Sequence, residues 1–208
     1  MGFNPLSLRA FSLSALEVLR FGHCCWWWKL RWAVWKEFKD LDVAGIVAHS
    51  EAVELSYGET PTVTFARILE ICALKPGARF VDLGAGRGVL VLAASMMGYS
   101  ATGLEIVADY VSRASEAARR LGVEVDLREQ DILNGEWPEG DLYLLNSTAF
   151  PQDMRIALLA RLKNLSPNSL VVTYDWTLDP SHFREQSALT LPVTRGTVTC
   201  RVYRRVVE

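Results

Sequence analysis

The sequence of 208 residues has no apolar stretch long enough to cross a membrane. A spanning helix needs about 18 or more consecutive apolar residues, and charged residues break every apolar run before that length. A secretory signal is also missing, because Arg9, Glu17 and Arg20 interrupt the apolar residues near the start and no cleavage site follows. We therefore expect a cytoplasmic protein, with peripheral contact at a membrane surface as an alternative.

Excess positive charge and metal-binding patterns are lacking as well. The formal net charge is -2 and the pI is about 6.0. Nucleic-acid-binding domains usually present a basic face, so we expect no nucleic-acid partner. The histidines are scattered and the cysteines lack metal-ligand spacing, which predicts no metal site and reduced thiols. The four cysteines are Cys24, Cys25, Cys72 and Cys200.

Tryptophan is concentrated near the N-terminus. Trp28, Trp32 and Trp35 recur at i, i+4 and i+7, which places them on one face of a helix, and lysines and arginines lie between them. We interpret residues 1–40 as an amphipathic helical extension whose aromatic face packs on the rest of the chain or on a second subunit. The alternative is that residues 21–39 lie at a membrane interface, where tryptophan and basic residues are favoured.

Regular alternation of helices and strands begins at Leu41, and residues 41–208 are predicted to form an α/β domain. Thr60 is expected to cap a helix whose first residue is Pro61. Short connections between alternating elements predict a parallel sheet with helices on both faces, and the last two strands read as an antiparallel hairpin. Helices are expected over 41–55, 61–74, 89–97, 107–121 and 154–165, and strands over 79–83, 101–106, 123–128, 142–145, 170–174, 188–193 and 197–206.

Three glycines follow the first predicted strand. Gly84, Gly86 and Gly88 lie between a strand and a helix, at the sheet edge where open parallel sheets bind ligands. Glycine allows a sharp turn and lets a ligand approach the backbone. The dinucleotide fingerprint would require a small residue at the position of Val89, so the spacing argues against a nicotinamide cofactor.

Acidic residues end the neighbouring strands. Glu105 ends the second strand, at the distance from the glycines at which a carboxylate receives ribose hydroxyls. Asp131 follows the third strand, where it would accept from an adenine amino group while the backbone amide of Ile132 donates to the ring. Asp82 would orient the glycine loop and approach the far end of the cofactor. Together these residues favour a nucleoside cofactor.

Four segments carry a resemblance to a known family. The run Val81-Asp82-Leu83-Gly84-Ala85-Gly86-Arg87-Gly88 resembles the first motif of class I methyltransferases. Ser56-Tyr57-Gly58-Glu59-Thr60-Pro61 resembles the loop before the cofactor site in the non-SET protein-lysine methyltransferases, which include the disruptor-of-telomeric-silencing histone enzymes, archaeal protein-lysine enzymes and mitochondrial ATP-synthase c-subunit enzymes. Leu145-Asn146-Ser147-Thr148-Ala149-Phe150 is similar to a segment of the histone subgroup, and 197–205 to the last strand of the two smaller subgroups.

The resemblance, which covers roughly residues 45–206, implies a seven-stranded Rossmann-like class I methyltransferase fold and a cofactor. The cofactor would be S-adenosylmethionine, with S-adenosylhomocysteine as product. Tyr57, Asn146 and Phe150 would border the acceptor amine, and the acceptor would be a lysine of a protein substrate. The alternatives are a small-molecule methyltransferase and a non-catalytic nucleoside-binding module recruited by the tryptophan-rich helix. The implied cofactor-binding residues are Tyr57, Glu59, Thr60, Asp82, Gly84, Ala85, Gly86, Gly88, Glu105, Ile106, Asp131, Ile132 and Asn146.

Overall fold

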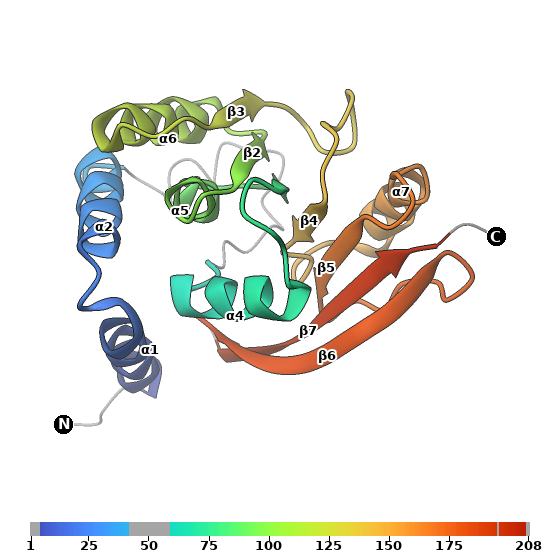
Figure 1. The fold of residues 1–208 in the computed structure, drawn as a ribbon, viewed down its shortest axis with the longest axis horizontal. Coiled ribbons are helices and arrows are strands. Elements are labelled where there is room, and N and C mark those ends of the chain that lie inside the picture. Colours follow the sequence, from blue (N-terminus) through green and yellow to red (C-terminus); the bar gives the residue numbers. More distant parts are fainter. Residues whose placement is uncertain (1–4, 42–58, 195, 207–208) are drawn as a thin grey trace.

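A seven-stranded sheet forms the centre of the computed structural model, which describes residues 5–41, 59–194 and 196–206 (Figure 1). The strand order is β3-β2-β1-β4-β5-β7-β6. The first five strands pair in parallel, whereas β7 runs antiparallel to both β5 and β6. This confirms the predicted mixed sheet with its C-terminal hairpin. The strands are β1 Arg79–Leu83, β2 Ser100–Glu105, β3 Asp126–Glu129, β4 Leu142–Leu145, β5 Leu170–Tyr174, β6 Phe183–Val193 and β7 Gly196–Arg205.

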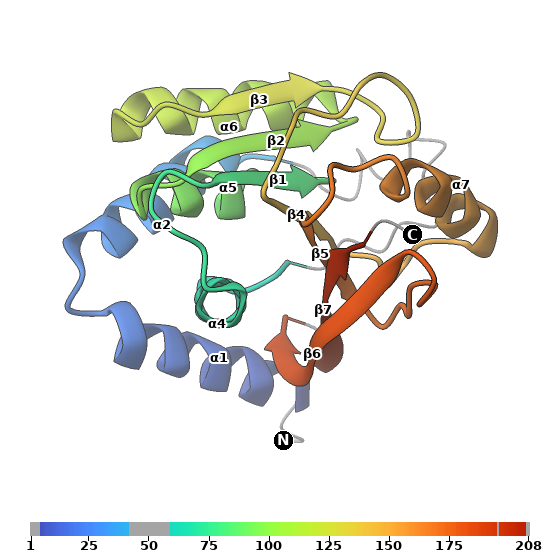
Figure 2. The same ribbon diagram turned by 45° about the vertical axis from the view of Figure 1, so that its right-hand side comes forward.

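Helices and loops cover both faces of the sheet (Figure 2). One face packs with α4, α5 and α6 in a single hydrophobic cluster, and α2 packs outside α5 and α6. The other face packs with α7 and the segments that follow β3 and β5. The central strands are buried on both sides, which explains their short, almost wholly apolar sequences. The helices are α1 Pro5–Phe21, α2 Cys25–Phe38, α4 Thr62–Cys72, α5 Val89–Met96, α6 Ala108–Leu121 and α7 Gln152–Leu162.

Two predicted features need separate comment. The helix expected over 41–55 lies outside the described residues, as does Tyr57. The predicted helix start at Pro61 is wrong: α4 begins at Thr62, and Pro61 is the residue before it, without a side-chain cap. The Thr60 hydroxyl instead donates to the Tyr174 hydroxyl at 3.1 Å, because Thr60 is buried against the end of β5.

Glu17 of α1 performs the capping that Thr60 does not. The backbone N–H of Thr62 donates to Glu17 Oε1 at 2.8 Å, and Glu17 Oε2 pairs with Arg31 of α2 at 3.1 Å. A carboxylate at a helix N-terminus satisfies a free amide and interacts favourably with the helix dipole. Because Glu17 is buried, one side chain ties α1 and α2 to α4.

Glu17→Ala should therefore lower the free energy of unfolding by about 1–2 kcal/mol, the usual cost of a lost cap plus an unpaired buried amide. Chemical denaturation monitored by circular dichroism measures this. Arg20→Ala is the matched control on the same helix, because the Arg20–Glu70 pair is exposed and such pairs contribute only about 0–1 kcal/mol. Equal losses for the two variants would show that Glu17 does not anchor the extension.

The aromatic face of α2 does not pack on the domain, so the interpretation that it docks there is wrong. The buried face of α2 carries Trp27, Leu30, Ala33, Val34 and Phe38. This face meets α5 and α6, where the small side chains of α6 allow close approach of the helices. The tryptophans singled out by their spacing are exposed instead: Trp28 by 51%, Trp32 by 51% and Trp35 by 59%.

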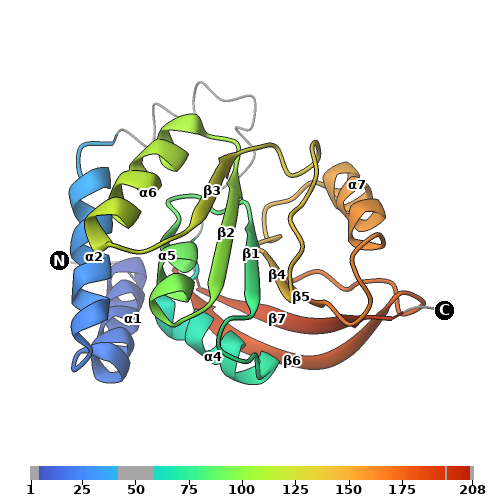
Figure 3. The ribbon, with the colours of Figure 1, turned by 45° about the horizontal axis from the view of Figure 1, so that its top comes forward.

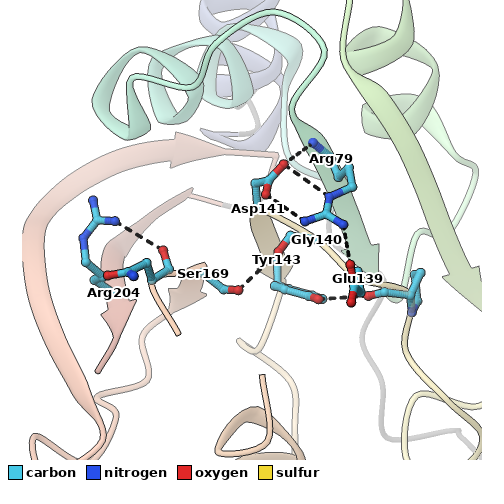
Figure 4. Close-up of polar contacts among 9 residues, drawn as sticks. Arg79, Glu139, Gly140, Asp141, Tyr143, Ser169 and Arg204 are labelled. Carbon is cyan, nitrogen blue, oxygen red and sulfur yellow. Dashed lines mark hydrogen bonds and ion pairs between the residues drawn. The ribbon is translucent and has the colours of Figure 1, made fainter. Parts of the chain in front are cut away.

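A polar cluster joins the strands at the edge of the sheet where β1 and β4 begin (Figure 4). Arg79, the first residue of β1, pairs with Glu139 at 2.6 Å and with Asp141 at 3.1 Å. Ser169 donates to the carbonyl oxygen of Gly140 at 3.2 Å. The Arg79 guanidinium lowers the pKa of the Asp141 carboxyl through hydrogen bonds and charge. These contacts align the amino-terminal ends of β1, β4 and β5, at the opposite end of the strands from the glycine loop.

Candidate functional site

The glycine loop turns at the carboxyl end of β1 and is held by the end of β2. The backbone N–H groups of Gly84 and Ala85 both donate to the carbonyl oxygen of Leu104 at 2.9 Å. The next amide, that of Gly86, donates to Glu105 Oε2 at 2.7 Å. Gly84 has a φ of 90°, which is in the left-handed region that favours glycine. The loop is thus fixed by β2 with one side left open.

A pocket opens on this loop. Seven of the residues predicted to bind the cofactor line it, and they come from the segment before α4, from β1, from the loop and from the end of β4. Parallel strands β1 and β4 are neighbours, so their carboxyl ends meet at this point. The seven residues are Glu59, Thr60, Asp82, Gly84, Ala85, Gly86 and Asn146. Four further lining residues were not predicted: Arg87, Val89, Leu90 and Leu144.

Asp82 is the most unusual group in the pocket. Asp82 is only 4% exposed, and no donor among the described residues forms a hydrogen bond with its carboxylate. Burial raises the pKa of the Asp82 carboxyl well above its usual range, and the nearby Glu105 carboxylate raises it further. A buried anion without a protein partner is costly. Its position in the pocket fits a ligand that carries positive charge and N–H donors.

Glu105 supports the loop and retains capacity for a ligand. Its Oε2 accepts from Gly86 and its Oε1 accepts from the backbone N–H of Val107 at 3.0 Å. Burial raises the pKa of Glu105, whereas these backbone hydrogen bonds lower it. The backbone of Ile106 also forms a hydrogen bond that lowers the pKa of Glu105, so three of the about four acceptor positions of this carboxylate are used within the protein. The remaining position fits one hydrogen bond from a ribose hydroxyl.

The segment Glu59–Thr60 is held from three sides. Arg87 of the glycine loop pairs with both carboxylate oxygens of Glu59, and its Nε donates to Oε1 at 2.6 Å. The hydroxyl of Thr194, at the end of β6, donates to the carbonyl oxygen of Glu59 at 3.2 Å. Together with the bond between Thr60 and Tyr174, these contacts place the segment across the pocket from Asp82. Arg87, rather than a ligand, is the described partner of the Glu59 carboxylate.

The loop after β4 places Asn146 at the pocket, and hydrogen bonds to Tyr174 and Arg155 hold this loop. Ser147 is fully buried; its hydroxyl donates to the Tyr174 carbonyl at 2.7 Å and accepts from the Tyr174 amide at 3.1 Å. Arg155 of α7 donates to the carbonyl oxygens of Ser147 and Phe150 at 2.9 Å and 3.1 Å. Thr148 donates to Asn146 Oδ1 at 3.0 Å. The loop therefore has a fixed shape.

Phe150 lies apart from Asn146, in a second pocket. It lines this pocket with Ile156, Leu159 and Trp176, between α7 and the segment after β5. The structure thus does not bring Asn146 and Phe150 into one pocket. The Arg155 guanidinium lies 5.9 Å from the centre of the Trp176 ring, and both residues line this pocket.

The predicted adenine-binding residues lie next to the glycine loop but do not line the pocket. Asp131 accepts from the backbone N–H of Leu133 at 2.8 Å and from Asn134 Nδ2 at 2.6 Å, so both its oxygens stabilise a turn. Ile132 buries its side chain in the core, while its backbone N–H meets no acceptor among the described residues. Ile106 is 54% exposed at the end of β2. Gly88 is buried beneath the loop against α6.

The residues that sequence reasoning missed differ in the signals that they offered. Tyr174 and Leu144 lie at or near the carboxyl ends of β5 and β4, where the strand-end rule that selected Glu105 would have found them. Arg87 stands inside the glycine motif, and its charge was the only indication of a pairing partner. Arg155 gave no signal, because its carbonyl acceptors are 5, 8 and 20 residues away.

The raised pKa values predict a pH dependence of cofactor binding. A cationic ligand favours the ionised carboxylates, so binding should release protons where the ligand-free pocket is protonated. Affinity should then fall as the pH drops from the raised pKa of Asp82 toward the ordinary value of about 3.9. Calorimetry at several pH values, in two buffers of different ionisation enthalpy, measures the released protons. A pH-independent affinity with no proton release would contradict this assignment.

Known structures share this architecture. The S-adenosylhomocysteine complex of an RNA methyltransferase from Salinibacter ruber is 28% identical, has a TM-score of 0.56 and covers 72% of this chain and 95% of that one. TrmN from Thermus thermophilus is 19% identical, with a TM-score of 0.62 over 74% of this chain and 51% of that one. The sheet and its glycine loop have the class I fold of S-adenosylmethionine-dependent methyltransferases. Asp82 and Glu105 fit the cationic and hydroxyl groups of that cofactor.

The family follows from the sequence match. The model of the family described as histone methylation protein DOT1 matches residues 42–188, and the chain belongs to this family. A curated relative, the H3 lysine-79 specific histone-lysine N-methyltransferase of Eremothecium gossypii, is 26% identical over 150 residues, or 64% of this chain. The chain spans only 26% of the length of that relative.

Proposed function

We propose that this chain transfers methyl groups from S-adenosylmethionine to a lysine amine of a protein substrate. The observation that carries the proposal is the DOT1 family match over residues 42–188, together with the histone-lysine methyltransferase relative. The pocket supports it, because the buried Asp82 carboxylate fits the cationic end of the cofactor in the pocket that Asn146 also lines. The histone named for that relative belongs to the proposed class of protein substrates. The acidic composition of this chain does not favour binding to nucleosomal DNA.

The chemistry asks little of the protein beyond alignment and exclusion of water. The bound cofactor supplies an electrophilic methyl group on a sulfonium. The acceptor lysine must lose its proton first, since with a pKa near 10.4 only about one lysine in a few thousand is neutral at pH 7. Apolar walls depress that pKa by desolvation. Tyr57 would supply one such wall, whereas Phe150 lines the separate pocket beside α7. Asn146 would accept a hydrogen bond from the amine through Oδ1.

The loop after β4 that carries Asn146 is held in place, which lowers the entropic cost of this alignment. Ser147 and Arg155 hold the loop through the hydrogen bonds described above, so Asn146 keeps its place without the cofactor. Preorganisation of this kind lowers the entropic cost of bringing two reactants together. We assign Ser147 and Arg155 as positioning residues that act through Asn146.

Two other acceptors have specific support. An RNA substrate is suggested by the name of the Salinibacter ruber neighbour at 28% identity, although this chain is acidic overall. A small-molecule acceptor would be favoured by a lid formed by residues 1–40, but the described part of that segment contributes no residue to the glycine-loop pocket. A non-catalytic module remains the third alternative and predicts cofactor binding without transfer.

The test is transfer of a labelled methyl group from S-adenosylmethionine to a cell extract by the purified protein. Protein, RNA and small-molecule fractions are separated and counted, with Asp82→Asn as the matched blank. We expect label in the protein fraction, with a protein band that the variant does not label. Label in RNA or small molecules alone would overturn the lysine proposal, and cofactor binding without any label would favour the non-catalytic module.

A further inference from the structure

The outer face of α2 is left largely exposed by the described residues. We propose that this face, formed by Trp28, Trp32, Trp35, Lys36 and Lys39, binds the surface of an anionic lipid bilayer. Figures 1 and 3 show α1 and α2 along one side of the molecule, with the C-terminus on the far side. The proposal concerns recruitment and goes beyond the proposed function, because none of these residues lines the glycine-loop pocket.

Exposure is the first argument. Each of the three tryptophans is about half exposed, and α1 adds Leu19, which is 79% exposed. Large apolar side chains grouped on one surface mark an interaction site, whereas single ones need no explanation. No helix among the described residues has the length and apolarity needed to cross a membrane. The face therefore fits a helix that lies in the plane of the interface.

Charge is the second argument. Residues 1–41 contain six lysines and arginines against three acidic residues, whereas the rest of the chain contains sixteen against twenty-one. Two of the three acids are already paired: Glu17 with Arg31, and Glu37 with Arg120 at 2.7 Å. The third, Asp40, lies 3.8 Å from Lys39. The basic extension would be drawn to an anionic surface, while the acidic domain would be held away from it.

The ring contacts favour lipid over other occupants. Lys36 Nζ lies 5.1 Å from the centre of the Trp32 ring, Arg120 lies 5.8 Å from the same ring, and Lys39 Nζ lies 5.6 Å from the Trp35 ring. Cations occupy the ring faces on which nucleic-acid bases would stack. A contact with a second copy would bury the Lys36 and Lys39 ammonium groups, which is costly unless acidic residues pair with them.

The indole N–H groups fit an interface as well. Trp28 donates to the carbonyl oxygen of Gly22 at 2.9 Å, which fixes its ring on the surface. The indole N–H groups of Trp32 and Trp35 meet no acceptor among the residues that the structure describes. Tryptophan with an apolar body and a free polar edge is favoured at the level of the lipid headgroups.

Co-sedimentation of the full chain with vesicles tests the proposal. We expect binding to phosphatidylcholine vesicles that contain phosphatidylglycerol, no binding to phosphatidylcholine alone, and weaker binding as salt is raised. The double variant Trp32→Ser/Trp35→Ser should lose about tenfold or more of the partition coefficient. The matched control is Ile156→Ser, which removes an equally exposed apolar side chain from α7 and should bind like the wild type.

Several results would overturn the proposal. These are equal binding to both vesicle types, undiminished binding by the double variant, or equal loss in the Ile156→Ser control. Binding of an RNA oligonucleotide that the double variant loses, or a dimer that it dissociates, without vesicle binding, would assign the face to another partner. Calorimetry with S-adenosylmethionine on every variant should give unchanged affinity, so that failure here is distinct from failure of the methyltransferase proposal.

Discussion

Replacing Asp82 with asparagine is expected to weaken S-adenosylmethionine binding roughly ten- to hundredfold. A hydrogen bond to a charged group contributes about 1.5–3 kcal/mol, and the amide also loses the attraction to the cationic end of the cofactor. The Asp82 carboxylate accepts no hydrogen bond from the described residues, so its charge is available to a ligand. Isothermal titration calorimetry of the purified proteins measures the change.

The same variant should be more stable than the wild type when no cofactor is present. Burial and Glu105 raise the pKa of Asp82, which means that the ionised form destabilises the ligand-free fold at neutral pH. Removing that charge should add about 1 kcal/mol, or about 2–4 °C in the melting temperature of a protein of this size. A variant that loses both stability and affinity would instead identify Asp82 as a structural residue.

Substitution of two glycines of the loop should affect different properties: mainly stability at Gly88 and mainly cofactor binding at Gly84. Gly88 has a φ of 71°, and a Cβ there would lie 2.8 Å from the Cβ of Ala114 on α6. Gly88→Val combines a left-handed conformation with overpacking, and should cost about 2–5 kcal/mol of the 5–15 kcal/mol that stabilise a typical domain. Denaturation by urea measures this loss.

Gly84→Ala is the counterpart. Its φ of 90° also strains an alanine, at about 1–2 kcal/mol, but a Cβ there meets no protein atom within 4 Å. The new methyl group would project at the pocket that Gly84 lines, so the folded variant should bind the cofactor poorly. If Gly84→Ala bound the cofactor normally, the ligand would not approach the loop at this point.

The sequence predicted the core of the fold because its signals are local. β1, β4 and β5 begin and end where the short apolar runs do, since strands buried on both faces leave little ambiguity. The strand predicted over 123–128 instead begins at Asp126, at an edge of the sheet where burial is weak. β6 begins at Phe183 rather than Ala188, because a bulge between Glu185 and Ser187 carries the pairing through polar residues.

The site was predicted less completely because its contacts join distant parts of the chain. The strand-end rule found Asp82 and Glu105, but it could not show that Arg87 pairs with Glu59 or that Glu17 caps α4 across 45 residues. Periodicity in the N-terminal helix identified the tryptophan face correctly, but the expectation that this face packs on the domain is wrong, because a pattern defines a face without saying which neighbour covers it. Ser147 carried no predicted role of its own, and the structure shows its hydroxyl bonded twice to Tyr174.

The most direct test of the central claim is the chemical identity of the methylated group. Protein labelled by the purified chain and radioactive S-adenosylmethionine is hydrolysed completely, and its amino acids are separated beside methyl-lysine and methyl-arginine standards. A pocket built around Asp82 and Asn146 that serves a lysine amine predicts radioactivity in methyl-lysine, absent with Asp82→Asn. Radioactivity in methyl-arginine would contradict the proposed acceptor. Loss of the label when the protein is treated with base before hydrolysis would also contradict it, because it would identify methyl esters.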